Sequence, residues 1–260
     1  MEFTGRPNTI RTKESLYYNW VEKNLKPDGS NLAACVTLWE ENLQPHSVRQ
    51  VLYVAKEAVR QAKGIELDIR SHVSRVMRSK QDKTIRTLSK EEIAVLTPVI
   101  EASYPKLYLP YMIGLHTGMR RGEVYGLLWS DVDILKDQIL VSKSYNGPTK
   151  NGKSRIVPIS FALEKVLLAN MPRCSYNYKK VIKRSFDPNP LLRAAAKEAG
   201  LRESADLHFH LLRHTWATLA LEAGRSPALV SKALGHSSLS TTLDLYWQAG
   251  DRKIDLGFLA

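Results

Sequence analysis

Apolar residues recur at helical spacing through the first third of the chain, between residues 14 and 78. The first amphipathic stripe consists of Leu16, Trp20, Val21 and Leu25. Such spacing places apolar side chains on one face of a helix. A polar break at residues 26–31, with Pro27 and Gly29, then predicts a turn.

Three more helices are predicted before residue 78. The second runs from Leu32 to Leu43, and the third begins at Pro45–Ser47 and ends at Gly64. The apolar stripe of the third helix is formed by Val48, Val51, Leu52, Ala55, Ala58 and Val59. A fourth helix is expected over Ile65–Met77, so residues 1–77 predict a small helical domain.

The stretch from Arg78 to Lys90 is polar, rich in lysine and arginine, and without apolar periodicity. We interpret residues 78–90 as a linker between two domains. A basic extended segment can follow a phosphate backbone, but solvated linkers of this composition are as common, and both interpretations stay open. Ser89 with Glu92 three residues later has the pattern of a capping box and predicts a helix start.

The remaining residues, 91–260, predict a second domain that is mainly helical with one β signal. Residues 138–142 and 155–159 flank a polar loop with Asn151-Gly152, a pair favoured in tight hairpin turns. Helices are predicted at residues 161–171, 190–199, 211–223 and 227–234. The predicted fold class is therefore α+β, mainly α with a small β-sheet or hairpin.

The charge balance adds a partner to this picture. The 260 residues include 38 Lys and Arg against 26 Asp and Glu, a formal net charge of +12. The surplus is +4 over residues 1–85 and +8 over residues 86–260, so both domains are basic. Basic folded domains favour a polyanionic partner, nucleic acid first, although a solvated basic surface without a partner has the same composition.

Cysteine usage and hydropathy point to the compartment. Cys35 and Cys174 are too few for a disulfide framework or a metal site, which favours a reducing environment. No secretory signal is visible, and the most apolar stretch, Leu107–Leu115, is far shorter than a membrane span. We expect a cytoplasmic protein with no membrane partner, associated with the nucleoid if it is bacterial, archaeal or phage-encoded.

Two segments of the second domain carry cations in positions suited to phosphate. A glycine turn delivers Arg120 at a helix start, with Glu123 one turn on to hold the guanidinium in place. The same spacing also occurs in everyday surface pairs. Lys150 and Lys153 lie at the tip of the predicted hairpin, where they can reach into a groove, although such lysines are usually only solvated.

Three further segments lie nearer the C-terminus. His210 and Arg213 share one side of a predicted helix, and with His214 they favour phosphate over zinc because no thiol or carboxylate cluster completes a metal site. His236 follows a helix end and a glycine turn. Tyr246 ends a short helical run, and such a tyrosine taken alone is more often a packing residue.

In order along the chain, the segments TGMRRGE, TKNGK, HLLRH, LGHSS and TTLDLY resemble the tyrosine recombinase family, which includes phage integrases and Xer resolvases. Each segment is weak evidence alone, but all of them in order across most of residues 86–250 are specific. The helical domain resembles the family's core-binding domain more loosely. The family's catalytic set falls here on Arg120, Lys150, His210, Arg213, His236 and Tyr246.

The resemblance implies site-specific cleavage and rejoining of DNA through a 3′-phosphotyrosine at Tyr246, without metal, ATP or another cofactor. Arg120 and Arg213 are expected to hold the phosphate oxygens. His210 and His236 add hydrogen bonds, with His210 as the candidate base. Lys150 protonates the leaving 5′-oxygen, and Lys153 is the alternative for this role.

The implied partners are double-stranded DNA with specific recombination sites, a homotetramer on two duplexes, and accessory DNA-bending or directionality proteins. The family exchanges C-terminal segments between subunits. Residues 251–260 are apolar enough to dock on a neighbour or to fold back on their own domain, and both stay open.

Other functions are compatible with parts of this pattern. A resolvase or a relaxing topoisomerase shares the chemistry, and a DNA-binding regulator shares the fold without the cutting. A metal-dependent nuclease is disfavoured because it needs a dense carboxylate cluster.

Overall fold

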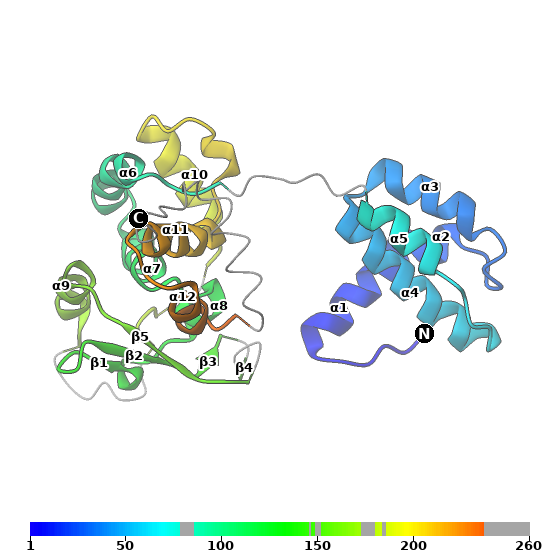
Figure 1. Ribbon diagram of the computed structural model, residues 1–260, viewed down its shortest axis with the longest axis horizontal. Coiled ribbons are helices and arrows are strands. Elements are labelled where there is room, and N and C mark those ends of the chain that lie inside the picture. Colours follow the sequence, from blue (N-terminus) through cyan, green and yellow to red (C-terminus); the bar gives the residue numbers. More distant parts are fainter. Residues whose placement is uncertain (79–85, 146, 149–151, 173–179, 184–185, 237–260) are drawn as a thin grey trace, which may run out of the picture. The chain divides into compact units, whose positions relative to one another are not determined.

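The computed structural model describes residues 1–78, 86–145, 147–148, 152–172, 180–183 and 186–236. The chain divides into two compact units, Met1–Lys83 and Thr84–Ala260, each with its own hydrophobic core. Figure 1 shows the first unit as a group of helices and the second as helices with small β-sheets. The predicted α+β fold class, mainly α with a small sheet, is confirmed.

The first unit contains α1 (Pro7–Leu16), a π-helical turn (Tyr17–Val21), α2 (Glu22–Asn24), α3 (Leu32–Asn42), α4 (Pro45–Lys63) and α5 (Arg70–Arg78). The predicted second and third helices are confirmed. The first begins earlier than predicted because Pro7 suits the opening position of a helix, where no N–H is needed. The fourth begins later, at Arg70, whose N–H donates to the Asp68 carboxylate (3.0 Å).

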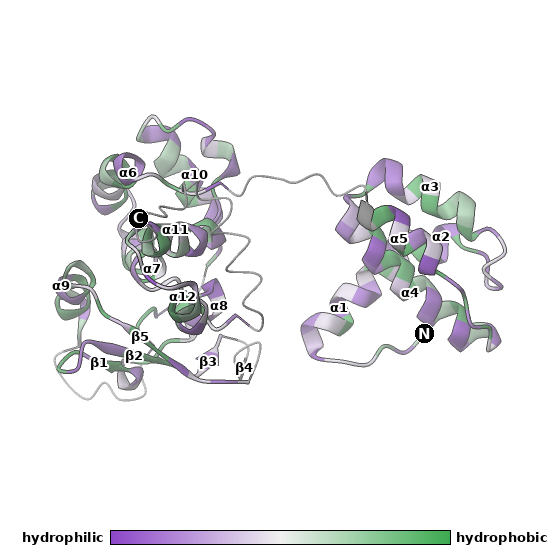
Figure 2. Cartoon of the chain, in the orientation of Figure 1, coloured by the Kyte–Doolittle hydropathy of each residue, from purple (hydrophilic) through white to green (hydrophobic). Residues whose placement is uncertain are grey.

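The core of the first unit lies along α4. All six residues of its predicted apolar stripe are buried, as is Trp39 of α3. Gly64 ends the helix in the left-handed conformation (φ 68°), which a glycine adopts without steric cost. The helices of both units have apolar residues on some faces and polar residues on others (Figure 2), as expected where one face packs against a core.

The second unit contains α6 (Lys90–Ser103), α7 (Pro105–Thr117), α8 (Arg121–Gly126), α9 (Phe161–Asn170), α10 (Asn189–Glu198), α11 (Phe209–Glu222) and α12 (Pro227–Leu234). Short 3-10 turns occupy Trp129–Asp131 and Ser204–Asp206. Helix α7 is buried along most of its length and packs against α11. A Cβ at Gly114 would lie 2.8 Å from the Phe209 ring, so this glycine permits the close packing.

Strands β1 (Val132–Asp133), β2 (Gln138–Val141) and β5 (Arg155–Pro158) form an antiparallel sheet in the order β1-β2-β5. The predicted pairing of the two β segments is confirmed, with Val141 opposite Arg155. Between them, β3 (Lys143–Ser144) pairs with β4 (Gly147–Pro148). This pairing lies ahead of the predicted Asn151-Gly152 turn, of which Asn151 lies outside the described residues.

The end of the predicted linker packs on the second unit. Residues 79–85 lie outside the described part, but Leu88 is buried in the core and its N–H donates to the Thr215 hydroxyl (2.9 Å). The predicted capping box at α6 is confirmed, since Ser89 and Glu92 exchange hydrogen bonds of 2.9 and 3.1 Å. Residues 86–89 are thus held by α6 and α11.

Candidate active site

Helix α8 begins with a pair of opposite charges. Gly118 (φ 63°) ends α7, and Arg120 then leads into α8 in an extended conformation. The Glu123 carboxylate accepts hydrogen bonds from the Arg120 N–H (2.8 Å) and from its guanidinium (3.1 Å). Because the Glu123 side chain is only 2% exposed, this contact differs from most surface pairs at the same spacing. The expected hold of the carboxylate on Arg120 is present.

A second arginine shares the same carboxylate. Arg155, at the start of β5, donates two parallel hydrogen bonds from Nη1 and Nη2 to Glu123 (3.0 and 2.7 Å). Burial alone would raise the pKa of the Glu123 carboxyl, but the hydrogen bonds and charges of Arg155 and Arg120 outweigh it and hold the pKa below its usual value. Glu123 is therefore an ionised carboxylate between two guanidinium groups.

Helix α12 ends in a Schellman motif directly before His236. The Gly235 N–H donates to the Lys232 carbonyl and the His236 N–H to the Ser231 carbonyl, both at 3.1 Å. Gly235 is left-handed (φ 65°), as this motif requires. The motif satisfies two of the four carbonyl groups that a helix end leaves without partners. The last two of the helix, those of Ala233 and Leu234, and the carbonyl of Gly235 just beyond it require other donors.

Three arginines from three different elements supply those missing donors. The donors, acceptors and distances are Arg155 to Ala233 (2.6 Å), Arg213 to Leu234 (2.8 Å) and Arg120 to Gly235 (3.3 Å). Every carbonyl from residue 231 to residue 235 thus has an identified donor. The negative end of the α12 dipole adds to the attraction for the three guanidinium groups.

This cluster keeps an excess of positive charge. Arg213 is 2% exposed and donates a second hydrogen bond to the Gly118 carbonyl (2.8 Å). Burial and the charge of Arg120 lower its pKa, yet a guanidinium stays protonated at neutral pH. Three cationic side chains stand against the single carboxylate of Glu123, so the cluster is suited to an anion.

Two histidines flank the arginines. Desolvation, followed by the charges of His214 and Arg213, lowers the pKa of His210 to about 4. Desolvation, followed by Arg213 and Arg120, lowers the pKa of His236 to about 4 as well. Both imidazoles are therefore neutral near pH 7, each with one nitrogen able to accept a proton.

Part of this cluster faces a hollow of about 1000 Å³ beside α12, which we call the cationic groove. Its polar lining includes Arg120, Lys153, Arg155, Lys232 and His236. Exposed apolar side chains of the sheet and of α12, among them Leu140, Ile156 and Leu229, line the rest. The groove is large enough for a phosphate-bearing ligand, and its charge favours one.

The structure brings four of the six expected site residues into one neighbourhood. Arg120 and His236 line the cationic groove, and Arg213 bonds to the helix end beside them. His210 lies one turn before Arg213 on α11, near enough for the charges of Arg213 and Arg120 to lower its pKa. The alternative lysine, Lys153, also lines the groove.

The remaining expected residues lie outside the described part of the chain. These are the lysine Lys150 and the nucleophile Tyr246, together with the predicted C-terminal segment 251–260. Their positions relative to the arginine cluster therefore stay predictions.

The sequence reasoning missed Arg155. A signal was present, because Arg155 and Val157 are two residues apart in a strand and so face the same side. Val157 belongs to the core. A cation on the core-facing side of a strand predicts a buried acidic partner, which here is Glu123.

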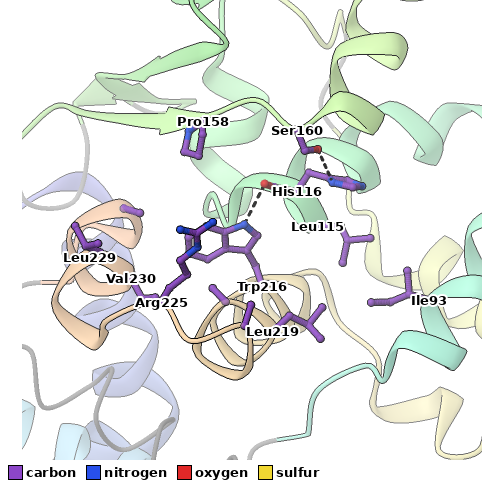
Figure 3. Close-up of a pocket in the computed structure, with 13 residues that line it drawn as sticks. Ile93, Leu115, His116, Pro158, Ser160, Trp216, Leu219, Arg225, Leu229 and Val230 are labelled. Atoms are coloured by element: carbon purple, nitrogen blue, oxygen red, sulfur yellow. Dashed lines mark hydrogen bonds between the residues drawn. The ribbon is translucent and has the colours of Figure 1, made fainter.

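A second hollow, of about 680 Å³, is mostly apolar (Figure 3). Leu115, Trp216, Leu229 and Val230 line it. At its polar edge the Ser160 hydroxyl and His116 Nδ1 are 2.8 Å apart, and the Trp216 indole N–H donates to the His116 carbonyl (3.0 Å). These contacts tie α7, α9 and α11 together.

Two properties bear on ligand classes. In the part of the chain that the structure describes, no three His, Cys, Asp or Glu side chains gather as metal ligands would. Every helix among the described residues is too short or too polar to cross a lipid bilayer.

Comparison with known proteins shows what the second unit is similar to in sequence. The sequence model of the phage integrase family matches residues 86–252. The tyrosine recombinase XerA of Saccharolobus solfataricus is 32% identical over 181 residues, covering 69% of this chain and 57% of that protein. XerA of Pyrococcus horikoshii is 27% identical, covering 93% and 84%. The match to the first two curated relatives spans only 57% and 51% of their lengths.

Solved structures with the same fold include two integrases bound to DNA. The Tn1549 transposon integrase in complex with circular intermediate DNA has a TM-score of 0.75 at 19% identity, covering 98% of this chain and 93% of that one. A lambda integrase dimer bound to a COC′ core site has a TM-score of 0.70 at 19% identity, covering 96% and 91%. At this identity the likeness concerns the fold.

Proposed function

The chain belongs to the phage integrase family, and from this premise we propose that it is a site-specific tyrosine recombinase, which cleaves and rejoins DNA through a 3′-phosphotyrosine intermediate at Tyr246. The observation that carries the proposal is the cluster of Arg120, Arg213 and His236 at the end of α12. Such a cluster has the donors that a phosphodiester needs as negative charge develops on it.

In the proposed reaction Arg120 and Arg213 bind the two non-bridging oxygens and stabilise the pentacoordinate transition state. A phenol titrates near pH ~10 and attacks well only if its proton is removed as the bond forms. His210 is neutral at pH 7 and accepts that proton. His236 donates a further hydrogen bond to the phosphate.

Lys150 is the proposed acid, with Lys153 as its alternative. As the Tyr246 oxygen bonds to phosphorus, the bond from phosphorus to the 5′-oxygen breaks, and the lysine proton passes to that oxygen. The phosphotyrosine conserves the energy of the phosphodiester, so a 5′-hydroxyl of another strand can reverse the step. The reaction therefore requires neither ATP nor a metal ion as a cofactor.

The proposal extends to organisation and partners. Residues 1–77 act as a core-binding domain, residues 78–90 as the linker and residues 91–260 as the catalytic domain on double-stranded DNA. Two recombination sites are joined by a homotetramer, aided by accessory DNA-bending or directionality proteins. The protein acts in the cytoplasm, at the nucleoid in a bacterial or archaeal host. DNA-bound relatives of the same fold support the DNA partner.

Covalent trapping tests this function. Nicked suicide duplexes tiled across the DNA that flanks the coding sequence are incubated with the protein in EDTA, beside Tyr246→Phe. We expect a protein–DNA adduct with wild type that is absent with Tyr246→Phe. DNA binding without an adduct would contradict the assignment and favour a DNA-binding regulator. A parallel incubation with Mg²⁺ in place of EDTA completes the test, because cleavage that occurs only with Mg²⁺ would favour a metal-dependent nuclease.

A further inference from the structure

We propose that Arg155 is a positioning residue for the reaction, which holds the lysine-bearing loop of the hairpin in register with the end of α12. This inference rests on the proposed function and adds a residue to the six site residues named above. Arg155 would not touch the DNA phosphate. It would act through the groups that do.

The side chain of Arg155 makes contacts with two elements at once. Its two terminal nitrogens bind Glu123 of α8, and its Nε binds the Ala233 carbonyl of α12. It is 9% exposed, so these bonds are formed largely out of water, where they hold their geometry more firmly. Its backbone belongs to β5, opposite Val141 of β2.

Space for this arrangement is provided by a glycine. A Cβ at Gly235 would lie 3.1 Å from the Arg155 Cδ and 3.3 Å from its Nη1. Gly235 thus serves the left-handed helix end and also admits the guanidinium beneath it. His236, the next residue, is positioned by the same helix end that Arg155 caps.

The loop that carries the candidate acids ends at Arg155. Lys153 is two residues before it and lines the same groove as Arg120 and His236. A strand residue fixed at its side chain and at its backbone limits how far the preceding residues can move. Arg155 is therefore the nearest fixed point from which a lysine of this loop would reach the leaving oxygen.

The charge pattern gives Arg155 a second effect on the same groups. Glu123 would otherwise be paired with Arg120 alone, and an ion pair of one acid and one base would weaken the pull of Arg120 on a phosphate. With Arg155 bonded to both carboxylate oxygens, Arg120 keeps an excess positive charge for the ligand. Loss of Arg155 would thus shift both Arg120 and the lysine loop.

A change of leaving group separates positioning of the acid from a general loss of structure. In one duplex a sulfur atom replaces the 5′-bridging oxygen at the scissile phosphate. A thiol titrates near pH ~8.5, so the thiolate departs without a proton, whereas an alkoxide needs one. The two duplexes therefore differ in how much they depend on a correctly placed lysine.

The full-length variants are Arg155→Met and Arg155→Lys, with Arg193→Met as the matched control. Arg193 also donates to a backbone carbonyl, that of Leu207 (3.1 Å), but it does not line the groove. Arg155→Lys keeps the charge and protects against a failure to fold, yet an ammonium cannot reproduce the three bonds. Thermal unfolding shows which preparations are folded before rates are compared.

With the DNA captured by wild type, both Arg155 variants should form the adduct about 100-fold more slowly, the order of loss that misplaced catalytic groups produce. On the sulfur-bridged duplex the deficit should shrink to about tenfold or less, and Arg193→Met should match wild type on both. An equal deficit on the two duplexes, or no deficit on either, would overturn the inference.

Failure of the proposed function has a separate signature. If wild type forms no adduct on any duplex, that function is contradicted whatever Arg155 does. The geometry assigned to Arg155 is then tested by hydrogen exchange of the full chain. Faster exchange in Arg155→Lys at residues 231–236, and not in Arg193→Met, supports it; unchanged exchange at those residues contradicts it.

Discussion

Two ion pairs, one in each unit of this protein, differ in their exposure to water. In the first unit, Arg75 and Glu40 form an ion pair of 2.7 Å with exposed fractions of 55% and 34%, so both side chains remain hydrated. In the second unit, Glu123 and Arg155 are 2% and 9% exposed and bond at the same distance. The two pairs have the same distance between their charges, but they differ in how far water reaches them.

This difference separates two ways of binding a polyanion. Hydrated charges contribute little to stability one by one, and they act together on a phosphate backbone in a manner that salt weakens. Buried charges must be paired or bonded to carbonyl groups, which fixes their direction. Under the proposed function, exposed charges of the first unit would help to hold DNA, and the buried cluster of the second unit would act on one phosphate.

The largest effect that would test this contrast is on the rate. Arg213→Ala should slow adduct formation by about 10²–10³-fold, because a fixed donor to the transition state is lost. Arg70→Ala removes a cation of the first unit that is 90% exposed. It should slow the reaction by no more than about tenfold, and higher protein concentration should restore the rate. A comparable loss in both variants at saturating protein would break the comparison.

The next effect is on stability. Glu123→Gln removes the carboxylate that binds two buried arginines, and it should lower the free energy of unfolding by about 3 kcal/mol. Glu40→Gln should lower it by at most about 1 kcal/mol. Urea unfolding followed by the tryptophan fluorescence of the full chain measures both. An unfolding free energy for Glu123→Gln within error of wild type would show that the buried carboxylate is not needed.

Close packing gives a third contrast, between two glycines. A Cβ at Gly126 would lie 2.6 Å from the Ser144 carbonyl carbon, so Gly126→Ala should cost about 2 kcal/mol as β3 is pushed away from α8. Gly64 has open space and only its left-handed φ of 68°, so Gly64→Ala should cost about 1 kcal/mol. Thermal unfolding ranks the two, and the reverse order would contradict the tight contact of β3 with α8.

The smallest predicted effect is the pH dependence of the stability of the second unit. The folded-state pKa of His236 is about 4, below the value near 6.5 of an unfolded histidine. Between these values the unfolded chain binds more protons, so stability is full above pH ~6.5 and falls as the pH drops toward ~4. For His236 alone the loss should be about 1–2 kcal/mol after allowance for solvent screening.

His236→Asn should flatten this part of the stability curve. Hydrogen exchange at pH 6.5 and 4.5 measures the change separately in each unit of the full chain. A pH dependence of the second unit that is identical in wild type and His236→Asn would contradict the lowered pKa.

Local patterns in the sequence determined much of the fold. The apolar stripe of α4 is predictable because a helix repeats every 3.6 residues. Its end is predictable because a glycine such as Gly64 adopts the left-handed conformation without steric cost. Helix α12 has its predicted bounds for the same reason, with Ser226 as its N-cap and Gly235 after its end. The order of the recombinase motifs also lies wholly in the sequence, so the resemblance to the family follows from the sequence alone.

Only the tertiary structure decided which groups each arginine contacts. Arg120 and Glu123 are neighbours in sequence and were paired correctly, but Arg155 is 32 residues from Glu123 and 78 from Ala233. No local period relates positions so far apart. The contacts of Arg155 depend on where β5 and α12 pack. A buried donor or carbonyl without a partner costs free energy, so burial favours the packing that pairs them. The sequence by itself determined the kind of chemistry, and the packing of distant elements determined the geometry that would perform it.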